Sequence, residues 1–287
     1  FSKLYKSTVK NIFKYLLAAF VLVFTGCSDY LDVNTNPNTS TDVPAGTVMT
    51  NASLALSQVL LNTLNPDGEA FIQHHKPVVV LTGPDTYSYS SIGNNNFWQY
   101  TFYGDIIKDL NLAVELAETQ GLTNGVAQIR IIQAMAWTIG VDRWGEMPFL
   151  ESNNPDILFP KFDGGAVIYQ GIIDILDDAI GRINLADQSS LTTITDHDAL
   201  HGGDMNKWLA FANSLKLRVL MRISYVEDRS SEIAALLSSG TFIDALDGSE
   251  NAEFAYYPNR NNQNFDYATF DNFVSFGSFQ VDAGERI

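Results

Sequence analysis

The chain has 287 residues, of which 46% are hydrophobic, so it can bury a substantial core and form one large domain or two ordinary ones. Its formal net charge of −16 argues against nucleic acid as a partner, because neutralising phosphates requires clustered lysine and arginine. Neutral ligands are compatible with so acidic a composition.

Residues 1–27 have the pattern of a signal peptide. Four lysines and no acidic residue accompany an apolar stretch at 15–24 that is too short to span a membrane. Cys27, the only cysteine, excludes an internal disulfide. It follows Thr25 and Gly26, and the arrangement resembles the lipobox of bacterial lipoproteins, with Phe24 where leucine is usual. That resemblance implies lipidation of Cys27; the alternative is a secreted protein with an incidental cysteine. Without this segment, 13 basic and 33 acidic residues leave a charge of about −20.

Residues 28–47 are expected to form a tether, because they are rich in asparagine, serine, threonine and proline and lack helical periodicity. The alternating acidic and amide residues from Asp32 to Asn36 resemble the start of an EF-hand loop. However, Pro37 replaces the required glycine, and Val43 stands where the bidentate glutamate should be. We therefore expect no calcium site there.

Apolar residues at three- and four-residue spacing predict most of the remaining chain to be helical. The expected helices are 48–64, 97–119, 126–141, a segment that begins at Asp163 or the following glycines and runs to about 183, the stretch after Asp204, and 230–239. A short helical turn is expected within 242–254. The segments 84–96, 142–160 and 187–198 are expected to be loops. The sequence therefore predicts an all-α fold of stacked helix pairs with long irregular loops.

The clearest helix follows Asp204, whose carboxylate is a suitable N-cap. Its apolar face, beginning at Trp208, is expected to be buried. Four basic residues lie on it without an acidic neighbour: Lys207, Lys216, Arg218 and Arg222. In so acidic a chain they are expected to pair with carboxylates from neighbouring helices, and a direct role in ligand binding is the alternative.

Four segments together resemble one family. They are 31–38, 134–149 with its Trp-Gly-Glu-Met-Pro-Phe run, 160–170, and 203–218. Their order and spacing are similar to those of the SusD/RagB family over roughly residues 20–258. The resemblance implies TPR-like helix pairs at 48–258, followed by the start of a C-terminal region at 259–287 that stops short of the family's usual length. It also implies an outer-membrane lipoprotein that binds glycans or other nutrients, has no catalytic activity or cofactor, and works with a SusC-like TonB-dependent transporter.

Binding a sugar requires exposed aromatic faces together with amides or carboxylates that pair with hydroxyl groups. The loop at 84–96 has this composition, and its candidate ligand-binding residues are Tyr87, Tyr89, Asn94, Asn95 and Asn96. A solvated loop with incidental tyrosines is the alternative. Trp98 is expected to belong to the core, as are Trp137, Trp144 and Trp208.

Other sequence patterns that could indicate a metal site or a catalytic site are weaker. His197 and His201 have the four-residue spacing of a zinc pair, but Gly202 and Gly203 follow at once, so a rigid helix holding both is not expected. Neither a phosphate-binding loop nor a serine nucleophile elbow occurs in the sequence. A secreted glycan hydrolase and a non-catalytic adhesive lipoprotein are kept as alternatives to nutrient binding.

Overall fold

A computed structural model describes residues 43–60, 72, 75–76, 96–254 and 282–283. The helices are α2 (Ala45–Val59), η4 (Phe97–Ile107), α4 (Lys108–Thr119), α5 (Thr123–Trp144), α6 (Gly165–Arg182), α7 (Met205–Ile223) and α8 (Ser230–Ser239). Two-residue strands β1 (His75–Lys76) and β2 (Asp282–Ala283) pair in antiparallel register, with His75 opposite Ala283. The all-α fold expected from the sequence is confirmed for the part of the chain that the structure describes.

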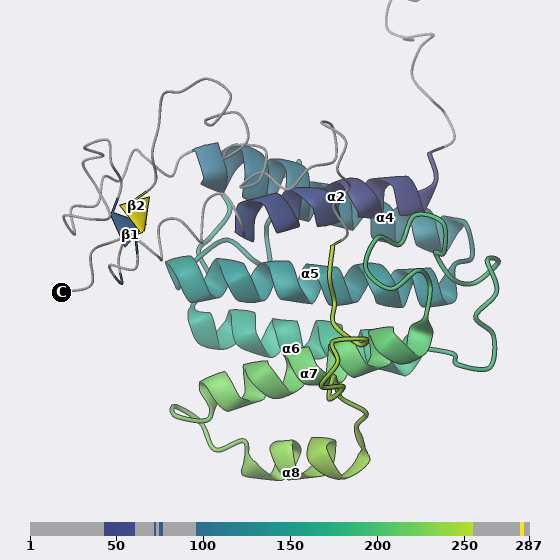
Figure 1. Ribbon diagram of the computed structural model, residues 1–287. Coiled ribbons are helices and arrows are strands. Elements are labelled where there is room, and N and C mark those ends of the chain that lie inside the picture. The colour runs from purple at the N-terminus through teal and green to yellow at the C-terminus, as the bar shows by residue number, and fades with distance from the viewer. Residues whose placement is uncertain (1–42, 61–71, 73–74, 77–95, 255–281, 284–287) are drawn as a thin grey trace, which may run out of the picture. The chain divides into compact units, whose positions relative to one another are not determined.

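The helices pack in the order in which they occur along the chain. Figure 1 shows α2 and α4 on one side of α5, followed on the other side by α6, α7 and α8. The most extensive contacts are those of α5 with α6 and α4, and of α2 with α4. Each helix therefore buries one face against the next, which is how stacked helical pairs make a continuous core.

Helix α5 is apolar on nearly every side and is enclosed by its neighbours, as expected of a central helix. Its buried apolar residues are Val126, Ala127, Ile129, Ile131, Ile132, Ala134, Ala136, Trp137 and Val141. The helix is three residues longer at each end than the range 126–141 that its hydrophobic pattern predicted. Polar residues at both ends extend it beyond the apolar run.

The ends of the helices follow the local sequence. Asp204 caps α7 as predicted, because its carboxylate accepts hydrogen bonds from Asn206 N (3.0 Å) and Lys207 N (3.4 Å). Gly145, with φ of 75°, ends α5, and its N–H donates to Val141 O at 2.9 Å. The central expectation that Trp208 is buried is confirmed, since its side chain is fully enclosed.

Residues 242–254 contain no helix, so the short helical turn expected there is wrong. The Glu250 carboxylate accepts hydrogen bonds from Asp244 N (3.0 Å) and Ala245 N (3.3 Å), which offers the backbone an alternative to helical bonding. Gly248, with φ of 77°, then turns the chain. Among the described helices, none has both the length and the apolar content needed to cross a membrane.

Candidate ligand-binding site

Of the five residues predicted to bind ligand, Tyr87, Tyr89, Asn94 and Asn95 lie outside the described residues, as does the lipidation candidate Cys27. Asn96 is described. It is exposed, has helical backbone angles and precedes η4 directly, and its side chain does not cap the helix. The loop prediction therefore stays a prediction, and its described end lies two residues from Trp98.

Helix η4 gathers aromatic side chains because its turns are those of a π-helix. In such a helix residues five apart approach one another. Accordingly, the ring centroids of Trp98 and Tyr103 are 5.2 Å apart and those of Phe97 and Phe102 are 6.4 Å apart. Trp144, at the end of α5, packs against Trp98 with a centroid distance of 4.7 Å and an interplanar angle of 86°. Trp98 is partly buried against the core, in line with its predicted packing role.

The two ends of the connector between α5 and α6, residues 145–164, are joined to each other by backbone hydrogen bonds. Met147 N donates to Asp163 O at 3.2 Å, and Asp163 N donates to Met147 O at 3.0 Å. The Asp163 carboxylate also accepts from Phe149 N (3.0 Å) and Leu150 N (2.8 Å). These bonds satisfy backbone groups of an irregular segment, and they give the connector a defined conformation.

Tyr103 joins this connector to η4. Its hydroxyl donates to Pro148 O at 2.7 Å, and its own carbonyl accepts from Asn153 Nδ2 at 3.2 Å. Burial raises the pKa of Tyr103 above its usual range, and the negative charge of Asp163 adds to the increase. The phenol therefore stays protonated at physiological pH and continues to donate its hydrogen bond to the connector.

The connector exposes four large apolar side chains despite being firmly held. The exposed fractions are 70% for Leu150, 82% for Leu158, 85% for Phe159 and 62% for Phe162. The Phe162 ring lies nearly parallel to the indole of Trp98, with an interplanar angle of 11° and a centroid distance of 6.1 Å. No periodicity in the sequence marked Phe162, since it lies in an irregular segment among prolines.

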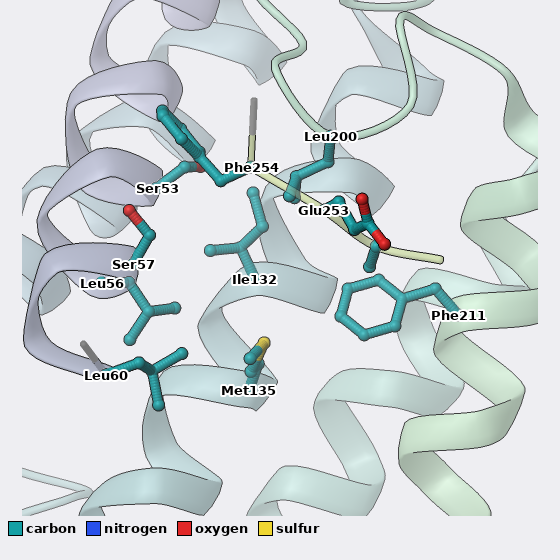
Figure 2. A pocket seen from close by; sticks show the side chains of 11 residues that line it. Ser53, Leu56, Ser57, Leu60, Ile132, Met135, Leu200, Phe211, Glu253 and Phe254 are labelled. Atoms are coloured by element: carbon teal, nitrogen blue, oxygen red, sulfur yellow. The ribbon is translucent and has the colours of Figure 1, made fainter. Parts of the chain in front are cut away.

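A cavity of about 360 Å³ lies between α2, α5, α7 and the extended segment at 252–254 (Figure 2). Its lining residues are Ser53, Leu56, Ser57, Leu60, Ile132, Met135, Leu200, Phe211, Ala252, Glu253 and Phe254. The hydroxyl groups of Ser53 and Ser57 donate to Met49 O (2.7 Å) and Leu54 O (2.8 Å) in their own helix. The lining is mostly apolar, and Glu253 is its one charged residue, so this cavity offers a sugar few hydrogen-bonding partners.

The two histidines with zinc-like spacing have separate environments. The His201 ring packs edge-on against Trp208, with centroids 5.1 Å apart, while Thr50 Oγ1 donates to the backbone carbonyl of His197 at 2.5 Å. Burial lowers the pKa of His201, and the nearby Asp198 only partly opposes this. No cluster of three or more metal-ligating side chains occurs within the described ranges.

Asp198 is a buried structural centre that sequence reasoning missed. Its Oδ2 accepts from Trp208 Nε1 (2.7 Å), Gly203 N (2.8 Å) and Gln128 Nε2 (3.1 Å). Its Oδ1 accepts from Leu200 N (3.0 Å) and His201 N (3.1 Å). The donors come from α5, α7 and the loop that precedes α7, so the carboxylate ties these three segments together.

The expectation that the basic residues of α7 attract carboxylates is confirmed for two of them. Lys216 pairs with Asp177 of α6, and Arg222 Nε lies 2.9 Å from Asp142 Oδ1 of α5. Tyr169 donates to the same Asp142 oxygen at 2.5 Å. Burial, followed by this hydrogen bond to Asp142, raises the pKa of Tyr169. These side chains therefore join α5, α6 and α7.

The chain is similar to SusD-like proteins in sequence and in fold. A model of a SusD-like family, described as "Starch-binding associating with outer membrane", matches residues 37–283. A SusD/RagB family protein from Bacteroides thetaiotaomicron has 22% identity and a TM-score of 0.67, covering 84% of this chain and 50% of its own. A SusD homologue from Parabacteroides distasonis has 23% identity and a TM-score of 0.65, covering 83% of this chain and 45% of its own.

A solved chitin-binding protein has 21% identity and a TM-score of 0.62, covering 72% of this chain and 45% of its own. The chain thus spans about half the length of the solved structures that it matches. No curated protein gives a match. At these identities the solved structures establish a shared fold, and they leave ligand and partner to be argued from the chain itself.

Proposed function

We propose that this chain, which belongs to the SusD-like family whose model it matches, binds glycans or related nutrients at the outer membrane and does no chemistry on them. The observation that carries the proposal is the family match over residues 37–283, because the family is described as starch-binding and outer-membrane-associated. The chitin-binding function of a structural neighbour supports a carbohydrate ligand as well. The fold alone would not suffice, since one fold serves many functions.

The surface chemistry of the described residues agrees with a neutral, hydroxyl-rich ligand. Two of the basic residues on α7, Lys216 and Arg222, are engaged in ion pairs within the fold. Exposed rings, in contrast, lie on the connector, and the exposed amide of Asn96 lies at the start of η4. Aromatic faces and amides are what recognition of a sugar requires.

Anchoring and delivery extend the proposal. We infer that Cys27 carries the lipid, on the strength of its position after a short apolar stretch and two small or polar residues. Ligand would then be passed to a SusC-like TonB-dependent transporter, the partner that the family resemblance implies. A lipid anchor would hold the helical domain at the membrane, and a separate transporter would carry the ligand across it. Both are therefore consistent with a binding protein.

The test is affinity gel electrophoresis of the purified chain through gels containing soluble starch, glycol chitin or no polysaccharide. We expect retardation by at least one polysaccharide, and no release of reducing sugar after prolonged incubation with it. Release of reducing sugar would favour the hydrolase alternative. Migration unaffected by either polysaccharide, together with capture of a protein partner by the same chain, would favour the adhesive alternative.

A further inference from the structure

The strongest unexplained feature of the described surface is the pair formed by Phe162 and Trp98. Phe162 is 62% exposed although it is a large apolar residue on a well-ordered connector. The plane of its ring lies within 11° of the plane of the Trp98 indole, with the ring centroids 6.1 Å apart. Because most of Phe162 is exposed, its ring offers aromatic surface to the solvent beside the indole.

The backbone on both sides of Phe162 is fixed, so the ring is positioned before any ligand arrives. On one side, Lys161 N donates to Glu151 Oε2 at 2.9 Å. On the other, Asp163 exchanges two backbone hydrogen bonds with Met147. Binding surfaces that are ordered in advance lose less conformational entropy when a ligand binds, which favours a recognition role over an incidental exposure.

Trp98 is fixed from behind in the same manner. Its indole packs edge-on against Trp144, with centroids 4.7 Å apart, and against Tyr103, with centroids 5.2 Å apart. Tyr103 is in turn bonded to the connector through Pro148 O at 2.7 Å. Trp98, on η4, therefore lies beside the Phe162 ring, and hydrogen bonds of Lys161 and Asp163 fix the connector backbone on both sides of Phe162.

We propose that Phe162, backed by Trp98, is a stacking platform for one pyranose ring of a neutral oligosaccharide; the proposal rests on the glycan-binding function inferred above. The axial C–H groups on one face of a pyranose match the negative face of an aromatic ring. A protein with a net charge of −16 is suited to a neutral ligand of this kind.

Polar groups that could pair with sugar hydroxyls flank the platform along the chain. The Lys161 ammonium, on a side chain that is 83% exposed, lies 3.7 Å from Glu151 Oε1. Such an exposed pair contributes little to stability and can exchange its partner for a ligand. Asn96, two residues before Trp98, is exposed as well and belongs to the loop predicted to bind ligand. The segments that carry the two rings thus also carry a carboxylate, an ammonium and an amide, which are the polar groups that a sugar subsite uses.

The experiment is isothermal titration of the full chain with maltoheptaose and with chitohexaose, in the wild type and in variants at Phe162. We expect Phe162→Leu to weaken binding at least about tenfold, because leucine keeps the apolar bulk but has no flat face, and a stacked base or ring contact is worth roughly that much. Phe162→Tyr should restore affinity to within about threefold. The matched control is Phe159→Leu, on the same connector and 85% exposed, which should change affinity less than about twofold.

The outcomes separate the two proposals. Failure of the wild type to bind either glycan overturns the proposed function for starch-like and chitin-like ligands, and the platform with it. Wild-type binding that survives Phe162→Leu leaves the proposed function standing and overturns the platform. Equal losses in Phe162→Leu and Phe159→Leu would also overturn it, because they would indicate that the glycan contacts the exposed apolar side chains of the connector in general, with no stacking site at Phe162. Unchanged thermal unfolding of each variant establishes that the fold is intact.

Discussion

Replacing Asp198 by alanine should be among the most destabilising single changes outside the apolar core. The side chain is only 7% exposed, and it accepts five hydrogen bonds that join α5, α7 and the loop between residues 198 and 204. Without the carboxylate, Trp208 Nε1 and Gly203 N would each be a buried donor without this acceptor, while Gln128 Nε2 would keep only its bond to Ile194 O. Each such group costs about 1–3 kcal/mol.

These costs will not add fully, because water can enter the space left and the neighbouring groups can relax. We expect the free energy of unfolding to fall by about 3–5 kcal/mol in Asp198→Ala, measured by urea denaturation. The matched control is Asp196→Ala, two residues away on an exposed side chain, for which a change within about 0.5 kcal/mol is expected.

A double-mutant cycle tests the cause of this loss. Trp208→Phe keeps a buried aromatic ring, although a smaller one, and removes the Nε1 donor that lies 2.7 Å from Asp198 Oδ2. If the hydrogen bond is responsible, the two substitutions should couple by about 1 kcal/mol or more. A loss below about 1 kcal/mol in Asp198→Ala, or additive effects in the double variant, would refute the assignment of Asp198 as a structural centre.

Three further outcomes are expected. Burial lowers the pKa of His201, so the unfolded chain takes up a proton more readily as the pH falls through about 6.5, and stability should decline there. His201→Gln should flatten that decline in thermal melts at about pH 7.5 and 5.5, and an unchanged slope would contradict it. Lys216→Ala should cost less than about 1 kcal/mol in urea denaturation, because its partner Asp177 is half exposed; a larger loss would mean that the pair is screened from water. Cys27→Ser should move the protein from the membrane fraction to the soluble fraction on cell fractionation, and retention at the membrane would disprove lipid anchoring there.

The helices could be predicted from the sequence because their signals are local and repeated. Asp204 followed by the apolar face of α7 predicted both the cap and the burial of Trp208. The nearly continuous apolar run of α5 likewise predicted its central position. Periodicity reports which face of a helix is buried, and stacking then follows, since each such face requires a neighbour.

The candidate platform could not be predicted in the same way. Phe162 lies among prolines and charged residues, and its relation to Trp98 depends on contacts between segments more than 60 positions apart. Trp98 was expected to be core, and it does pack against the core, but no local pattern indicates that an exposed ring lies beside it. Side-chain geometry of this kind depends on tertiary contacts, such as the backbone pairing of Met147 with Asp163 in the connector.

Buried amides on α5 show why the irregular segments are nevertheless well defined. Gln128 forms two hydrogen bonds of 2.9 Å with the backbone of Ile194, one as donor and one as acceptor. Asn124 binds the carbonyls of Asn184 and Asp187 at 3.2 and 2.8 Å. At the opposite end of α5, Trp144 supports the indole of Trp98.

Helix α5 thus positions the loop between Asn184 and Ile194 at its N-terminal turns, and the aromatic residues around Trp98 at its C-terminal end. The polar residues at its start satisfy the backbone of a segment that could not otherwise be enclosed, because a buried backbone group without a partner is costly. The aromatic residues at its end pack around Trp98, while Phe162 beside them stays exposed. The first loop therefore contributes to the stability of the fold, and the connector after α5 is where we place the proposed stacking platform.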